Sequence, residues 1–143
     1  MAYISASDIS YVMTDTELIQ LTDDAGTGSI VTGRVNEVIG MAAAIIDSYI
    51  GGRYKVPLTA LVPEVVKTVS VSIGVYLLYM RSGFPVIPDK FKWAYDDAIT
   101  LLKDIARGTA TLGIEETTQE RENAASNKPA NDRIFTNNSM RGY

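Results

Sequence analysis

The sequence contains neither cysteine nor histidine among its 143 residues. Without cysteine, the chain cannot form a disulfide, use a thiol nucleophile or hold zinc through thiolates. Without histidine, it lacks the general base of Ser-His-Asp triads and the commonest metal ligand of proteins. These absences exclude the usual catalytic and metal-binding arrangements, and we predict no catalytic residue, no cofactor and no metal.

Positively charged residues are also few, since 13 Lys and Arg face 17 Asp and Glu, and the formal net charge is −4. A protein that grips nucleic acid presents Lys and Arg to the phosphates, so we do not expect direct binding of nucleic acid. The apolar fraction of 46% is typical of a soluble globular protein, and the length suits one core.

Long uninterrupted hydrophobic runs are missing as well. The most apolar stretch, residues 62–80, contains Pro63, Glu64 and Lys67, so it is too short for the roughly 20 apolar residues that span a bilayer. The first ten residues lack the basic start and apolar core of a signal peptide. We therefore expect a cytoplasmic protein without a membrane segment.

The signals that are present predict helices. Thr14 and Glu17 form the pattern of a capping box before a short helix at about 15–22. Thr32 is the predicted N-cap of a helix of about 18 residues, in which apolar side chains recur every three or four positions. The members of this stripe are Val35, Val38, Ile39, Ala42, Ile45, Ile46 and Tyr49.

Two further long helices begin at prolines and end before glycines, as helices commonly do. One runs from Pro63 to Arg81, and the other begins at Pro88 and ends before Gly108. The first is apolar on nearly every side and is predicted to be central, although its β-branched residues leave a strand as an alternative. Its predicted core stripe comprises Val65, Val66, Val69, Ile73, Tyr76, Leu77 and Met80.

The predicted fold is all-α, a small bundle of three long helices plus one or two short N-terminal helices, with an extended C-terminal tail. Residues 1–113 form the helical domain. Residues 114–143 are polar with few large apolar side chains, which predicts an extended or disordered tail. Because so few helices cannot cover a central helix that is apolar all round, we also predict a homo-oligomer.

The stretch "IIDSYIGGRYKVPL", residues 45–58, places a glycine pair after a helix. A phosphate-binding glycine loop precedes its helix, so Gly51 and Gly52 are interpreted as a helix stop with left-handed glycine. Arg53 is predicted to bond the free carbonyls of that helix end or to pair with Asp47. Tyr54 is predicted to fold back onto the core.

Other candidate sites fail on spacing. In "DDAGTGS" the twelfth position of a calcium loop would be Arg34 or Val35 instead of glutamate, and no phosphate-loop pattern is present. Adjacent acids on one helix point about 100° apart and do not form a catalytic pair. We predict that the four acids in such neighbouring pairs lie in solvent: Asp96, Asp97, Glu115 and Glu116.

Three stretches taken together carry a family resemblance: "AAAIIDSYIGGRYKVPL", "WAYDDAITLLKDIARGTATL" and "RIFTNNSMRGY". The chain resembles the small head-to-tail connector (adaptor) proteins of tailed bacteriophages, in particular the Mu-like prophage family long described as a domain of unknown function. "DTELIQLTD" and "DDAGTGSI" match as well. The sequence departs from the usual pattern at Val31, Thr32 and Asn137, which affects helix capping and tail contacts.

The resemblance implies a non-enzymatic virion protein that assembles in the host cytoplasm as a ring of about twelve copies. Such a ring lies beneath the portal, lets DNA pass without specific binding, and receives a tail or stopper protein. The implied portal contacts in the tail are Arg133, Ile134, Phe135, Met140, Arg141 and Tyr143. The implied fold and ring contacts are Asp47, Tyr49, Arg53, Tyr54 and Pro57.

Two other functions stay open at this point. A generic helical protein-binding or regulatory module would share the composition and the helices. An enzyme that uses carboxylates alone, such as a glycan-cleaving lysis protein, would need two facing acids roughly 5 to 10 Å apart. No pair in the sequence suggests itself for that role.

Overall fold

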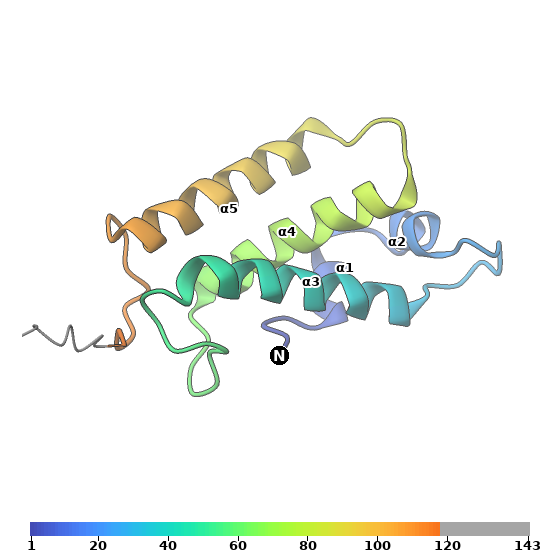
Figure 1. Cartoon of the computed structure of the whole chain (residues 1–143). Helices are drawn as coiled ribbons and strands as arrows, with labels where there is room; N and C mark the ends of the chain where they lie inside the picture. The colour runs from blue at the N-terminus through green and yellow to red at the C-terminus, as the bar shows by residue number, and fades with distance from the viewer. Residues whose placement is uncertain (118–143) are drawn as a thin grey trace, which may run out of the picture.

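The computed structural model describes residues 1–117, and the elements in this part of the chain are five α-helices. Their bounds are α1 (Ala6–Val12), α2 (Asp15–Thr22), α3 (Thr32–Ile50), α4 (Glu64–Ser82) and α5 (Asp89–Arg107). The predicted all-α fold, with three long helices and two short N-terminal ones, is confirmed. In Figure 1, α4 lies between α3 and α5, and α1 lies behind α3 and α4.

The ends of the helices follow from local chemistry. Thr14 and Glu17 form the predicted capping box of α2, with Thr14 N–H donating to the Glu17 carboxylate at 3.0 Å. Gly83 and Gly108 end α4 and α5 with φ of 68° and 86°, the left-handed conformation that glycine adopts readily. The predicted N-cap of α3 is wrong by one residue, because Val31 holds that position and Thr32 is already helical.

The glycine pair stops α3 as predicted, but for another reason. Gly51 has a φ of −61°, so the left-handed conformation expected there is wrong. A Cβ at Gly51 would lie 2.8 Å from the Asp47 carbonyl oxygen and 3.3 Å from Cγ2 of Val56. Glycine is therefore needed because a side chain would collide with the carbonyl oxygen of the last turn of α3 and crowd Val56 of the following loop.

Helices α3 and α4 each contact all four other helices, and α4 is the central one because it lies between α3 and α5 (Figure 1). Its predicted core stripe is partly wrong: Val65 and Met80 are exposed, whereas Val75, Leu78 and Tyr79 are buried. Both of the short helices pack on α4, and they cover a side that a three-helix arrangement would leave open. The strand alternative for this segment is excluded.

The predicted boundary between domain and tail, at residues 113 and 114, stays a prediction. Leu112 is buried and Ile114 packs against the core. The backbone N–H of Thr117, the last described residue, donates to the Arg53 carbonyl oxygen at 2.8 Å. The chain is therefore held against the domain as far as residue 117.

We expect Ile73→Ala to lower the free energy of unfolding by about 2 to 5 kcal/mol, because Ile73 is fully buried on the central helix and its loss leaves a cavity. Met80→Ala on the same helix, where the side chain is 58% exposed, should change it by less than about 0.5 kcal/mol. Urea unfolding of both variants tests this. Equal effects would mean that α4 is not the centre of the core.

Candidate functional site

Arg53 lies in the loop after α3 and closes the C-terminal end of α5. Its guanidinium donates to the carbonyl oxygens of Ile105 at 2.5 Å and Ala110 at 3.1 Å, and it pairs with the Glu116 carboxylate. The prediction that Arg53 bonds the end of α3 or pairs with Asp47 is therefore wrong. The reason is that α3 and α5 end on the same side of the molecule, so the free carbonyls of α5 lie within reach.

Tyr54 lies on the buried side of Arg53, and we call Arg53, Tyr54 and Glu116 the Arg53 cluster. Its side chain is 1% exposed, and its hydroxyl accepts from the Leu112 N–H at 3.0 Å and donates to Glu116 at 3.4 Å. Arg53 and Tyr54 thus fix the segment after α5 to the segment after α3. Glu116 is exposed, as predicted, and it is also their common acidic partner.

Asp47 has a different partner from the one predicted. The Tyr3 hydroxyl donates to the Asp47 carboxylate and accepts from the Leu58 N–H at 3.1 Å. Burial, followed by the hydrogen bond to Asp47, raises the pKa of Tyr3 to about 12. Sequence reasoning missed Tyr3, because a lone aromatic residue ahead of the first helix carries no periodic signal.

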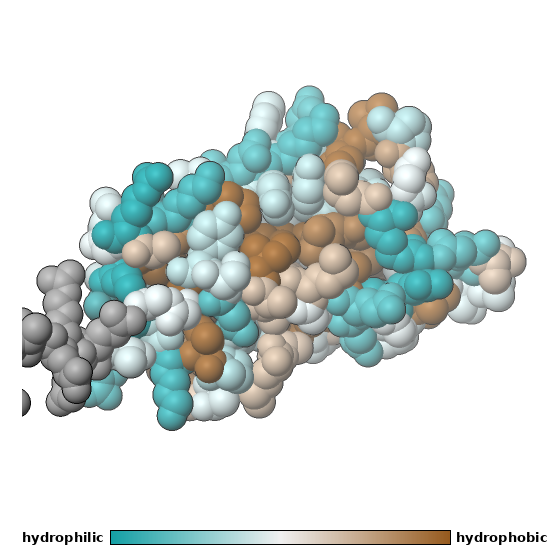
Figure 2. Space-filling view, viewed as in Figure 1, coloured by the Kyte–Doolittle hydropathy of each residue, from teal (hydrophilic) through white to brown (hydrophobic). Residues whose placement is uncertain are grey.

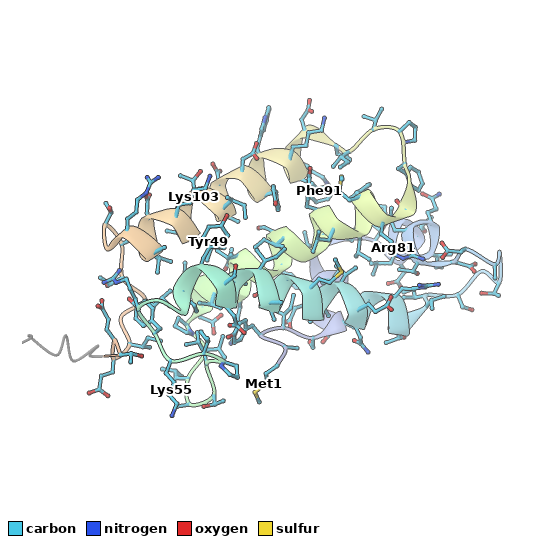
Figure 3. All side chains as sticks on the ribbon, viewed as in Figure 1. Met1, Tyr49, Lys55, Arg81, Phe91 and Lys103 are labelled. Carbon is cyan, nitrogen blue, oxygen red and sulfur yellow. The ribbon has the colours of Figure 1, made fainter. Side chains whose placement is uncertain are left out.

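Tyr49 and Pro57, the other two predicted contacts, retain accessible surface. Tyr49 is half-buried and packs against the core, and Figure 3 places it between α3 and α5. Close by, the rings of Tyr76 and Tyr95 stack with centroids 4.0 Å apart. Pro57 is exposed and follows a cis peptide bond. Of the five predicted fold and ring contacts, three are thus engaged within the chain.

Arg81 repeats the arrangement of Arg53 at the other end of the bundle. Its guanidinium donates to the Leu21 carbonyl oxygen at 2.9 Å and pairs with Asp24. Figure 3 shows Arg81 beside α2. Each arginine therefore closes the C-terminal end of a neighbouring helix, where the free carbonyls attract a cation.

A hollow of 660 Å³ opens between the N-terminal half of α3 and the C-terminal half of α4. Figure 1 shows α5 diverging from α3 toward this end, and Met80 of α4 is exposed there. Apolar surface gathers over α3 and α4 on the face seen in Figure 2. We call this the α3–α4 hollow, and its residues are Arg34, Glu37, Val38, Met41, Leu77, Met80 and Arg81.

A second apolar region lies where α1 meets α4 and α5. Tyr11 is 93% exposed and Val12 48%, and both line a hollow of 480 Å³ with residues of the two long helices. Trp93 on α5 is 67% exposed. Exposed apolar side chains that gather in these two regions mark candidate contacts with other polypeptides.

Within residues 1–117 the acidic residues do not gather into a metal-binding cluster. In that range no three His, Cys, Asp or Glu side chains lie close enough to hold a metal ion. Asp96, Asp97 and Glu115 are exposed, as predicted. No helix among the same residues has the length and apolar character needed to cross a membrane.

Comparison with known proteins identifies the family. The family described as Bacteriophage Mu, Gp36 matches residues 3–130 of the sequence. The chain belongs to this family. Mu-like prophage FluMu protein gp36 of Haemophilus influenzae is 32% identical over 117 residues, which cover 80% of this chain and 79% of that protein. The resemblance to the Mu-like phage family is therefore confirmed.

The predicted portal contacts of this Gp36 family member lie outside the described residues, and they also lie beyond residue 130, where the family match ends. They are Arg133, Ile134, Phe135, Met140, Arg141 and Tyr143. The last residue placed before them, Thr117, is held by the Arg53 loop. The Arg53 cluster thus holds the end of the described chain, up to Thr117, against the domain.

We expect Arg53→Ala to lower the free energy of unfolding by about 1 to 3 kcal/mol, because two carbonyls and the Glu116 carboxylate lose their donor. Lys55→Ala, an exposed residue of the same loop, should change it by less than about 0.5 kcal/mol. Thermal and urea unfolding measure both. Equal stability of Arg53→Ala and the original chain would refute the capping role.

The Tyr3 phenol predicts a stability change at alkaline pH. Its pKa is raised from 10.0 to about 12, so its contribution is complete below pH 10 and is lost as the pH rises toward 12. The Tyr3→Phe variant has no phenol to ionise, so its free energy of unfolding does not fall with pH for this reason. The stability difference between the two chains should therefore shrink by about 2 kcal/mol over that interval in urea titrations. A constant difference would mean that the phenol ionises as freely as in the unfolded chain.

Proposed function

We propose that the chain is a structural virion protein, a head-to-tail connector that assembles as a ring under the portal and links the DNA-filled head to the tail. Membership of the bacteriophage Mu Gp36 family supports a role in a phage particle. The resemblance of three sequence stretches to connector proteins supports the narrower role. The observation that carries the proposal is the apolar surface that the helical domain leaves exposed in two separate regions.

The exposed side chains favour binding over chemistry. Methionine and tyrosine are adaptable, half-apolar groups that are common in protein interfaces. Tyr11, Met41 and Met80 are among the exposed apolar side chains of the domain. With no histidine or cysteine in the sequence, we propose that the protein works without catalysis or a cofactor.

The charge of the chain suits a ring through which DNA moves. A duplex carries closely spaced negative charges and is held by cationic surfaces. A chain with a net charge of −4 offers few such holding points, so DNA can slide past it without specific binding. The proposed site of action is therefore the virion, after assembly in the bacterial host cytoplasm.

We propose that the C-terminal segment contacts the portal and that the helical domain provides the contacts between copies and with a tail or stopper protein. Arg53 and Tyr54 hold the chain that precedes this segment, up to Thr117, against the domain. Because Asp47, Arg53 and Tyr54 are bound within the chain, they act as fold residues. Contacts between copies must then use other side chains.

Mass measurement of the purified chain, alone and mixed with portal protein, tests this function. We expect oligomers of the full chain and a stable complex with the portal. Removal of residues 118–143 should abolish portal binding and leave the melting temperature unchanged, because the described core ends before residue 118. Undiminished portal binding by the shortened chain would contradict the tail assignment.

The same mass measurement distinguishes a connector from a generic protein-binding module. A full chain that stays monomeric at high concentration and does not bind the portal would contradict the connector and favour a generic protein-binding module. The variant Arg53→Lys is a useful control, since it keeps the charge of the full chain but loses the planar donor pair. It should oligomerise normally if the Arg53 cluster serves the fold.

A further inference from the structure

The segment that follows α5 passes the end of α3 (Figure 1), and we call residues 111–117 the strap. Leu112 is buried and Ile114 is half-buried, whereas the other residues of the strap are exposed. A segment that buries so little apolar surface gains little hydrophobic stabilisation from its own side chains. The strap therefore depends on polar contacts to stay in place.

These polar contacts meet at one point. Among the described residues, the hydrogen bonds that join the strap to the rest of the domain end at two consecutive residues, Arg53 and Tyr54. The Tyr54 hydroxyl accepts from the Leu112 N–H at 3.0 Å and donates to Glu116 at 3.4 Å. The Arg53 guanidinium pairs with Glu116, and the Arg53 carbonyl oxygen accepts from the Thr117 N–H at 2.8 Å. Both ends of the strap are thus fastened to the same place.

The domain side of this contact does not depend on the strap. The Arg53 guanidinium also donates to the carbonyl oxygens of Ile105 and Ala110, at the end of α5 and just after it. The hydrogen bonds that close the end of α5, from the N–H groups of Thr109 and Ala110 to the Asp104 carbonyl oxygen, precede the strap. Opening of the strap therefore breaks no hydrogen bond of the five helices.

We propose that the strap opens and closes as one unit, with the helices folded in both states, and that the Arg53 cluster sets the balance between them. Segments with few buried side chains and exposed hydrogen bonds open at a lower free energy than the core. The Glu116 side chain is 44% exposed, and a partly exposed ion pair contributes little stability. Contacts that meet at one point make the two ends of the strap open together.

The use of this device rests on the proposed function, in which residues beyond the strap contact the portal. An open strap adds up to about 25 Å of chain between the helical domain and that contact. When the domain and the portal are pulled apart, the strap gives way before the helices are loaded. The closed strap is the resting state, and it yields under tension.

Amide hydrogen exchange of the full chain, followed by NMR, tests the opening. The N–H groups of Leu112 and Thr117 should report the same free energy of opening, although they lie at opposite ends of the strap and bond different acceptors. Both should be at least about tenfold less protected than the N–H of Ile73, which lies in the core of α4. Protection of Leu112 equal to that of Ile73 would overturn the proposal.

Two substitutions and a matched control test the coupling between the ends. Tyr54→Phe removes the acceptor of the Leu112 N–H and leaves that of the Thr117 N–H, yet exchange should rise several-fold at both. Glu116→Ala, at an exposed position, should also raise both. Glu115→Ala, its exposed neighbour, should change neither. A rise at Leu112 alone in Tyr54→Phe would mean that the contacts break independently, which would overturn the proposal.

Pulling on single molecules of the full chain tests whether the strap yields first. The chain has no cysteine, so Val86→Cys in the exposed loop between α4 and α5 and a thiol added after Tyr143 supply two unique handles. We expect a separate first extension of up to about 25 Å at a lower force than the unfolding of the helices. Glu116→Ala should lower that force, and Glu115→Ala should leave it unchanged. Unfolding without a separate first extension would contradict a yielding strap.

These measurements use the isolated chain, so their failure differs from failure of the proposed function. Independent exchange of Leu112 and Thr117 in a chain that binds the portal would overturn the strap and leave the connector intact. Coupled exchange in a chain that does not bind the portal would support the strap and contradict both the connector and the use proposed here.

Discussion

The need to cover α4 governs the rest of this molecule. The helix carries apolar side chains around most of its circumference, and four other helices pack against it. Removing such surface from water is the main favourable contribution to folding. The two short helices and α3 cover most of α4, and α5 covers the remaining side until it diverges from α3 (Figure 1). Leu77 and Met80 remain partly uncovered where α5 departs.

Two arginines hold the ends of this arrangement together. Arg53 caps the C-terminal end of α5, and Arg81 caps the C-terminal end of α2. Each arginine belongs to a different segment of the chain from the helix that it caps. A guanidinium with several donors suits this task, because the last carbonyls of a helix have no partners of their own. The Arg53 cluster also holds the chain against the domain as far as Thr117.

The sequence predicts the helices well and their partners poorly. Capping boxes, prolines before helices and glycines after them are local signals, and they locate α2, α4 and α5 within about two residues. The partner of Arg53 is not a local property, because it depends on α3 and α5 ending side by side. The exposure of Met80 has the same origin, since periodicity identifies an apolar face but not which neighbour covers it. Tyr3 and Tyr11 lie near the start of the chain, where no repeating pattern shows that one is buried and the other exposed.

Hydroxyl-radical footprinting tests most directly whether the exposed apolar surface serves to bind other polypeptides. Methionine and tyrosine side chains react readily when exposed, so Tyr11, Met41 and Met80 should all be modified in the isolated chain. In the assembly with portal protein, we expect the modification of these three residues to fall several-fold, while Tyr54 stays protected in both states. Unchanged modification of Met41 and Met80 in an assembled particle would contradict the idea that another chain completes the cover of α4.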